Sequence, residues 1–464
     1  MKTIAFRTVI LFILIIIGAA GCGQDATTVD SVSAGNPSLH GEDTAAQENT
    51  SAGSAGNLPV RPAHRVSGVD LSDDDKTLIA EIDASLRLAG KFLLDAQSED
   101  GGWYSETYGL LRDGPTMTPY VMSSLLFMPQ TGREGEAAFG RGRALLINMV
   151  GGDGRLAVGS HDLHYPVYTS AMASRVVAHP KPTDAPGCGG QAAFLEYLAN
   201  RQLVERLGWT AEDPYYGGWG YSIGLPEKPA DGGHAGPFNS SNLSATTFAV
   251  AAFRSAKTDK DNKVFKAALQ FVFRCQNFGD DPRFDDGGFF FMPDDEAQNK
   301  AGACGVDDKG EQRFRSYGTM TADGIRCLIR CGLPVDHPRV EAARKWLADR
   351  FSATENPGQF PPDRISLKDA TYYYWVWSFA HAMIALRTSQ FELGDAADEN
   401  STESVDWPRV LARQLLKLQR EDGTWINELS AGMEDDPLVA TPWATAALAI
   451  CRAFISGELG PCRR

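Results

Sequence analysis

The sequence has few basic residues, and its basic residues do not gather into long clusters. Lys and Arg together number 44 against 59 Asp and Glu, so the formal net charge is -15. Proteins that bind nucleic acids neutralise a dense row of phosphates with clustered Lys and Arg side chains. We therefore expect no nucleic-acid partner for this chain.

The chain also lacks a Cys-x-x-Cys pair and a long apolar run after its first residues. Its eight Cys residues do not show the paired spacing that zinc ribbons use. The apolar run Val9–Ile17 is too short for a comfortable membrane-spanning helix, and no later run is longer. The sequence thus predicts no zinc ribbon, no other metal site, no cofactor and no further membrane span.

The first residues have the features of a targeting signal. Lys2 and Arg7 flank the start of the apolar run, and small residues then lead to Cys22. This segment resembles a bacterial lipoprotein signal, although Ala19 stands where such signals usually have Leu. The resemblance implies that residues 1–21 are removed, and that lipidated Cys22 anchors the protein to the periplasmic or cell-surface face of a bacterial membrane. A plain signal peptide or an uncleaved anchor is the alternative.

A composition change separates a linker from a folded body. Residues 22–73 are rich in Ser, Ala, Gly and Thr and have few large apolar side chains, which is typical of a disordered linker. From Asp74 onward, apolar residues such as Leu78 and Ile82 recur at helical spacing. We therefore predict a folded domain over residues 74–460.

Three stretches of this domain share one pattern. In Phe92–Trp103, Phe271–Phe289 and Leu415–Trp425, an apolar helical segment ends at Gln, a Gly-containing turn follows, and an aromatic residue comes last. Gly allows the chain to turn at low steric cost, and the aromatic ring packs back on the unit. Repeated units of this kind bury their apolar faces against their neighbours.

Helical segments alternate with such loops along the whole domain. They pair as 76–97 with 116–128, 136–150 with 165–178, 191–206 with 241–255, 262–276 with 316–331, 337–351 with 369–388, and 405–419 with 437–455. Closing six helical hairpins into a ring leaves no exposed end of the repeat. The predicted fold is therefore all-α, an α/α toroid.

The repeat resembles that of squalene-hopene cyclases and protein prenyltransferase β subunits. The residues that carry this resemblance are Gln97, Gly101 and Trp103; Gln276, Gly287 and Phe289; and Gln419, Gly423 and Trp425. It implies a toroid of six outer and six inner helices, whose inner helices line a central cavity. These inner helices would begin near Thr116, Tyr165, Ser241, Ser316, Asp369 and Pro437.

The catalytic motifs of both families are missing. Class II triterpene cyclases protonate their substrate with Asp-x-Asp-Asp, and the nearest match here is Glu434-Asp435-Asp436. Such acidic residues are also favoured at the start of a helix. Protein prenyltransferases hold zinc with Asp-x-Cys and a later His, but Thr371 follows Asp369 here in place of Cys. Neither zinc-dependent prenyl transfer nor cyclisation is expected.

A third toroid family, the thioester domains of complement-like proteins, joins Cys and Gln side chains within Gly-Cys-Gly-Glu-Gln. The segment from Gly187 to Gln191 resembles it and keeps the spacing of Cys188 and Gln191, with Gly190 in place of Glu. The resemblance implies a thioester between Cys188 and Gln191. A Gly-rich turn before a helix is the structural alternative.

The remaining candidates are polar and aromatic residues near the starts of the predicted inner helices. His161, Asp162, His164 and Asp323 are the candidate acid-base residues. Residues expected to line the cavity are Tyr165, Tyr168, Asn242, Ser316, Tyr317, Thr319, Asp369, Tyr372, Tyr373, Trp375 and His381. Core packing and helix capping would explain the same residues without a function.

The sequence therefore predicts a lipid-anchored toroid protein outside the cytoplasm, with a central cavity that binds a hydrophobic ligand. By resemblance, that ligand is an isoprenoid or another lipid, and a polymer is also compatible with a cavity. Two alternatives remain open. One is a terpenoid cyclase-like or glycan-active enzyme that uses cavity His and Asp groups, and the other is covalent attachment through Cys188. The oligomeric state does not follow from the sequence.

Overall fold

The structure is a computed structural model, and it describes residues 71–112, 115–128, 131–153, 156, 165–179, 190–230, 236–279, 281–394 and 402–459. These residues belong to one compact unit, residues 55–464. The signal peptide, Cys22 and most of the linker lie outside the described residues. So do three of the four candidate acid-base residues and one thioester residue, namely His161, Asp162, His164 and Cys188.

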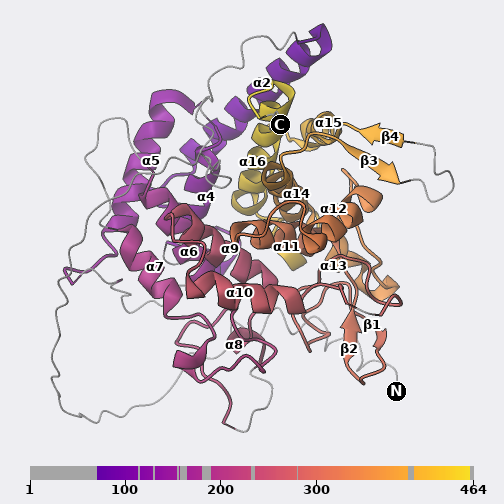
Figure 1. Ribbon diagram of the computed structural model, residues 1–464. Helices are drawn as coiled ribbons and strands as arrows, with labels where there is room; N and C mark the ends of the chain where they lie inside the picture. The colour runs from indigo at the N-terminus through magenta and orange to yellow at the C-terminus, as the bar shows by residue number, and fades with distance from the viewer. Residues whose placement is uncertain are drawn as a thin grey trace, which may run out of the picture. The chain divides into compact units, whose positions relative to one another are not determined.

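Helices of this unit alternate along the chain between outer and inner positions (Figure 1). The outer helices are α2 (Asp73–Asp95), α5 (Gly132–Ile147), α7 (Gln191–Ala199), α10 (Lys263–Arg274), α12 (Pro338–Arg350) and α15 (Trp407–Leu418). The inner helices are α4 (Met117–Leu125), α6 (Pro166–Val177), α9 (Leu243–Ser255), α11 (Gly318–Arg330), α14 (Tyr372–Leu386) and α16 (Pro437–Ile455).

The inner helices form a closed ring. Each packs against the next in chain order, and α16 packs back against α4. The all-α toroid predicted from the repeat is confirmed, and each predicted pair of segments contains one outer and one inner helix. α16 is long and apolar enough to cross a membrane, but 83% of its apolar stretch is buried inside the unit. It is a core helix of the ring.

Short elements occupy the loops. They are α3 (Gly109–Arg112), η3 (Glu205–Leu207), α8 (Gly236–Asn239), η4 (Pro362–Arg364), α13 (Ile365–Asp369) and η5 (Ser430–Gly432). Two antiparallel hairpins, which the sequence analysis did not predict, join β1 (Ala303–Val306) to β2 (Gln312–Phe314) and β3 (Phe391–Gly394) to β4 (Thr402–Val405). Both hairpins belong to long insertions, so the helical periodicity of the repeat contains no sign of them.

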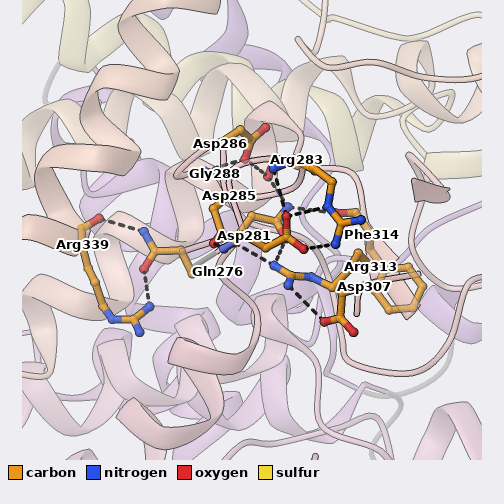
Figure 2. Close-up of polar contacts among 12 residues, drawn as sticks. Gln276, Asp281, Arg283, Asp285, Asp286, Gly288, Asp307, Arg313, Phe314 and Arg339 are labelled. Atoms are coloured by element: carbon orange, nitrogen blue, oxygen red, sulfur yellow. Dashed lines mark hydrogen bonds and ion pairs between the residues drawn. The ribbon is translucent and has the colours of Figure 1, made fainter. Parts of the chain in front are cut away.

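Four Gln side chains connect neighbouring hairpins in the same way. In the joint shown in Figure 2, the Nε2 group of Gln276 donates to the carbonyl of Gly287 in its own turn at 3.0 Å and to the carbonyl of Arg339 on α12 at 2.8 Å. The Arg339 guanidinium donates back to Gln276 Oε1. Equivalent pairs of acceptors are Gly101 and Ala138 for Gln97, Gly217 and Val264 for Gln202, and Gly423 and Ser85 for Gln419.

The Gly of each joint has a backbone conformation that other residues rarely adopt. Gly287 has φ 84° and Gly423 has φ 87°. A Cβ atom at Gly423 would lie 2.8 Å from the carbonyl oxygen of Leu88 on α2. The turn therefore needs Gly both for its φ angle and for its close approach to the next outer helix.

The Trp residue in three of these joints ties the turn to both helices of its own hairpin, and Phe289, which has no ring N–H, donates its backbone N–H to Thr321 Oγ1 on the inner helix α11. Trp425 donates from Nε1 to the carbonyl of Leu415 on α15, and its backbone N–H donates to Thr441 Oγ1 on α16. Trp103 and Trp219 make the same two bonds, with Leu93 and Thr118 and with Leu198 and Thr246. Each joint thus fixes an outer helix, an inner helix and the next outer helix relative to one another.

The last joint closes the ring on the first hairpin. Gln419 Nε2 donates to the carbonyl of Ser85 on α2 at 3.1 Å. Arg452 on α16 pairs with Asp83 at 2.6 Å, and Arg409 on α15 pairs with the largely buried Asp75 at 2.7 Å. Residues more than 300 positions apart are therefore held together by polar contacts as well as by apolar packing.

The insertion after the third joint of this kind carries its own ionic network. Arg313 on β2 pairs with Asp285 at 2.8 Å and with Asp307 at 3.5 Å, and Arg283 pairs with Asp281 (Figure 2). The Arg313–Asp285 pair, together with an Arg283–Asp308 pair at 2.9 Å, holds the β1–β2 hairpin against the turn that contains Gly287.

We predict that Gln419→Ala lowers the free energy of unfolding by about 1 to 3 kcal/mol, because two buried carbonyl groups each lose a donor. Denaturant-induced unfolding followed by tryptophan fluorescence measures this change. Gln312→Ala is the matched control, since the only partner of that side-chain amide within the described part of the chain is the exposed side chain of Glu296. Equal stabilities of the two variants would contradict the proposed closing role of Gln419.

Candidate functional site

The centre of the ring is defined by contacts between inner helices that are not neighbours. Phe248 on α9 stacks on Trp377 of α14 with ring centroids 5.4 Å apart, and Phe127 after α4 meets His381 of α14 at 5.5 Å. Each inner helix therefore turns one face toward the centre. Residues three or four positions apart share such a face. The central positions are Tyr168, Met172 and Arg175 on α6; Asp323, Arg326 and Arg330 on α11; and Tyr374, Trp377 and His381 on α14.

Aromatic rings fill most of this centre. Trp377 lies 4.2 Å from Trp443 of α16, and Tyr374 lies 5.3 Å from the same ring. Tyr120 of α4 contacts the edge of Trp443 at 4.6 Å. Among the described residues, these rings form a packed aromatic layer where the resemblance implies a central cavity.

A small pocket remains beside this layer. Its cavity volume is about 10 Å³. That is room for about one water. The residues around it are Tyr120, Ser123, Ser124, Met172, Arg175, Phe248, Trp377, Pro442, Trp443 and Ala446.

A buried carboxylate lies at the heart of the ring. Asp323 is 0% exposed and accepts hydrogen bonds from Tyr374 Oη at 2.5 Å and Ser378 Oγ at 2.6 Å. Its third partner, Arg326, forms an ion pair of 2.5 Å and stacks over Trp377 at 4.3 Å. Burial raises the pKa of Asp323, whereas the Arg326 charge and the two hydroxyl donors act in the opposite direction.

Hydroxyl groups continue from Asp323 toward the end of the ring where the inner helices start. Tyr374 Oη bonds with Ser244 Oγ on α9, which in turn bonds with Tyr168. Tyr168 Oη lies 3.2 Å from Tyr221 Oη. Tyr165, at the N-terminus of α6, packs against both of these tyrosine rings. These groups form a polar chain between the buried acid and half-buried tyrosines.

Tyr165 adopts an unusual backbone conformation. Its φ of 48° and ψ of 54° lie in the left-handed region, which is unfavourable for an aromatic residue. Strained positions of this kind cluster at functional sites. The residue directly follows the predicted His161, Asp162 and His164 cluster, which lies outside the described residues.

Positive charge gathers where the inner helices end. The Arg326 charge lowers the pKa of both Arg175 and Arg330, and the Arg175 charge also lowers the pKa of Arg330. Burial lowers the pKa of Arg175 to about 10, and the Arg326 charge adds to this. Burial together with all three guanidinium groups lowers the pKa of His381, whose Nδ1 contacts the carbonyl of Trp377 at 2.9 Å. His381 is therefore neutral at physiological pH.

Glu434 is a second buried acid, at the start of α14. Its carboxylate accepts the backbone N–H groups of Tyr373 at 2.9 Å and Tyr374 at 2.7 Å. Burial raises its pKa to about 8, against the effect of these donors and of the nearby Lys300 charge. The Glu434-Asp435-Asp436 segment therefore stabilises the starts of two inner helices, since Asp436 also caps α16.

Several predicted cavity residues lie in structural positions. Asn242 is buried and caps α9 through Ala245 N. Ser316 donates to Asp286 in the preceding turn. Tyr317 and Thr319 are buried at the start of α11, and each has a hydroxyl oxygen without a hydrogen-bond partner among the described residues.

Some aromatic residues of α14 point to loops beside the helix, and others point to the centre of the ring. Tyr372, Tyr373 and Trp375 donate to the carbonyls of Ala353, Ile426 and Ser352, in loops beside the helix. Asp369 ends α13, and its carbonyl accepts from Asn427. The residues that reach the centre from α14 are Tyr374, Trp377 and His381.

Gln191 begins α7 and donates from Nε2 to the carbonyl of Ser174 at 3.2 Å. The thioester with Cys188 stays a prediction, because Cys188 is outside the described residues. Within the described ranges, no three His, Cys, Asp or Glu side chains come together as metal ligands.

The sequence analysis missed the residues that shape the pocket and its charge. Arg175, Arg330, Tyr120 and Trp443 come from four inner helices. Helical spacing could have found two of them. Arg175 follows Tyr168 by seven residues and Arg330 follows Asp323 by seven, which places each Arg on the same helix face as the earlier residue. This spacing is informative only when the earlier residue is already known to face the centre.

Comparisons with known proteins identify the fold. No protein-family model matches this chain, and no curated protein matches its sequence. Among solved structures, cellobiose 2-epimerase from Spirochaeta thermophila is similar at 14% identity with a TM-score of 0.51, covering 84% of this chain and 99% of that chain. This likeness establishes the toroid fold and nothing finer.

Two other solved structures are similar at lower scores. Type II terpene cyclase MstE from Scytonema, in complex with merosterolic acid A, shares 14% identity over 83% of this chain and 99% of that chain, with a TM-score of 0.48. An α-1,6-mannanase from Salegentibacter shares 10% identity over 81% and 99%, with a TM-score of 0.47.

Glu434 generates a pH prediction. Its pKa of about 8 in the folded protein exceeds the ordinary Glu pKa of 4.5, so between these pH values the folded state retains a proton that the unfolded state has lost. Stability therefore falls as the pH rises from about 5 to 8, by at most about 1.4 kcal/mol per pH unit for one proton.

Urea midpoints of the parent and Glu434→Gln at pH 5, 6, 7 and 8 measure this effect. The parent is expected to lose stability relative to the variant as the pH rises, whereas exposed Glu421→Gln should follow the parent. Parallel curves for the parent and Glu434→Gln would show that Glu434 does not titrate in this range.

Proposed function

We propose that this protein binds a small, largely apolar ligand in the centre of its toroid. The observation that supports the proposal is the pocket of four aromatic side chains beside the half-buried Arg175. Binding sites for small molecules are typically lined by apolar and aromatic groups with a few polar groups that set orientation. Ser123, Ser124 and Arg175 supply those polar groups.

The size of the pocket narrows the ligand class. Its cavity of about 10 Å³ is room for about one water, far below the range of about 300 to 1,000 Å³ that is usual for drug-sized ligands. A single ring or one isoprene unit therefore requires the aromatic side chains around the pocket to rotate outward. A long isoprenoid or lipid chain would require the aromatic layer around Trp377 and Trp443 to open.

Binding is measured with indole and benzyl alcohol as probes, by calorimetry on the full chain. We expect Ala446→Leu to weaken binding by about tenfold or more, because the larger side chain occupies the pocket. Ala84→Leu makes the same change on the exposed face of α2 and should bind as the parent does.

Two results would contradict the proposal. One is that the parent protein binds neither indole nor benzyl alcohol. The other is equal affinity of the parent and a folded Ala446→Leu variant, which would place the ligand elsewhere.

A second candidate function is acid-base catalysis at the tyrosine end of the ring. The hydroxyl chain from Asp323 through Tyr374 to Tyr168 favours it, because a buried carboxyl group with a raised pKa can hold or deliver a proton. Chemical turnover of a bound ligand that is lost in Tyr374→Phe and retained in Tyr372→Phe would favour catalysis over binding alone. The terpenoid cyclase-like and glycan-active alternatives both belong to this candidate.

We further propose that the protein is anchored outside the cytoplasm through lipidated Cys22, as its first residues indicate. In a bacterial host, Cys22→Ser is expected to move the protein from the membrane fraction to the soluble fraction and to remove the acyl mass in intact mass spectrometry. Unchanged fractionation and mass would contradict the anchor.

A further inference from the structure

The guanidinium cluster formed by Arg175, Arg326 and Arg330 has more positive charge than its surroundings balance. Asp323 is the carboxylate that pairs with Arg326. Among the described residues, neither Arg175 nor Arg330 forms an ion pair with a carboxylate. Three guanidinium groups, of which Arg326 is buried and Arg175 and Arg330 are half-buried, thus share one carboxylate, and burial of unpaired charge is costly.

Specific donor atoms in this cluster are also unsatisfied. Arg326 is 2% exposed, and its Nε atom is buried without a hydrogen-bond partner among the described residues. The same holds for Nη1 of Arg330. Buried donors without acceptors are uncommon in folded proteins, so two in one cluster indicate that an acceptor belongs there.

Helix dipoles explain part of this arrangement. Arg175 and Arg330 lie in the last turns of α6 and α11, where the partial negative charge of a helix end favours a cation. A dipole lowers the electrostatic cost of these groups, but it does not supply a lone pair to Arg326 Nε or Arg330 Nη1. An additional acceptor is still needed.

The cluster is continuous with the pocket. Arg175 lines the pocket directly, and Trp377, whose ring Arg326 covers at 4.3 Å, forms another part of its wall. A ligand that occupies the pocket with an apolar body can therefore direct a polar end toward the guanidinium groups.

We propose that the guanidinium cluster binds the anionic end of the ligand, so that the ligand is a small oxyanion, a carboxylate or a phosphate ester, attached to an apolar body of about one ring. Arginine is suited to this role because its planar donors match the oxygens of carboxylate and phosphate. Neutral His381 lies beside the cluster and adds no competing charge. The proposal rests on the pocket as the ligand site and specifies the chemistry that the site selects.

Three probes that each contain one phenyl ring distinguish neutral, carboxylate and phosphate ligands. Benzyl alcohol is neutral, benzoate carries a carboxylate and phenyl phosphate carries a phosphate ester. Calorimetry on the full chain at constant ionic strength is expected to show at least one anion binding about tenfold or more tightly than benzyl alcohol, as charge-assisted hydrogen bonds in a buried site allow. The preferred anion distinguishes a carboxylate ligand from a phosphate ligand.

Two variants test whether the guanidinium cluster causes the preference for an anion over benzyl alcohol. Arg175→Gln and Arg330→Gln should each abolish most of the advantage of the anion. Arg330→Gln should also leave benzyl alcohol binding within about twofold, because Arg330 is not among the residues that line the pocket. Arg87→Gln, at an exposed position on α2, is the matched control and should retain the full preference.

The outcomes distinguish this inference from the proposed function. If benzyl alcohol binds as tightly as both anions, the proposed anion site is wrong, but the proposal that the pocket binds an apolar ligand still stands. A second result would also contradict the anion site. If an anion binds with equal affinity to the parent and to folded Arg175→Gln and Arg330→Gln variants, other residues bind its charged group. If none of the three probes binds, both proposals fail.

Discussion

The structure depends on one repeated polar joint. In each of four joints a Gln amide donates both to the Gly carbonyl of its own turn and to the next outer helix, as Gln276 and Gln419 do. A Gly with φ near 90° allows that close approach. Because Gln419 reaches α2, the last joint closes the ring. Apolar burial supplies the general driving force for folding, whereas the joints fix which helices become neighbours.

Closure determines what the centre can contain. Six inner helices direct one face each to a common axis, and their side chains are layered along it. Hydroxyl groups of Tyr168 and Tyr374 lie toward the helix starts, rings such as Trp377 lie in the middle, and guanidinium groups such as Arg175 lie toward the helix ends. Asp323 links the first layer to the third. A small amphipathic ligand matches such a gradient better than a uniformly apolar chain does.

The fold was predictable from sequence because the joint has a sequence signature. The pattern of Gln419, Gly423 and Trp425 recurs, and helical periodicity between copies locates both helices of each hairpin. The site was only partly predictable. Asp323 and His381 lie at the centre of the ring, whereas the residues of the aromatic run that reach the centre are Tyr374 and Trp377, in place of the predicted Tyr372, Tyr373 and Trp375. A run of consecutive aromatic residues on a helix covers every face, so only packing against neighbouring helices shows which members reach the centre. The half-buried Arg175 and Arg330 show the same limit, since they come close only after ring closure.

The central claim is that the middle of the ring holds an apolar ligand whose anionic end meets buried guanidinium groups. Anomalous diffraction from crystals of the full chain grown with 4-bromobenzoate tests it most directly, because bromine locates the ring and the electron density locates the carboxylate. The account predicts a bromine peak among Trp377, Trp443 and Tyr120, with the carboxylate within hydrogen-bond distance of Arg175 or Arg330. Bromine peaks confined to the surface, with the aromatic layer unchanged, would contradict it.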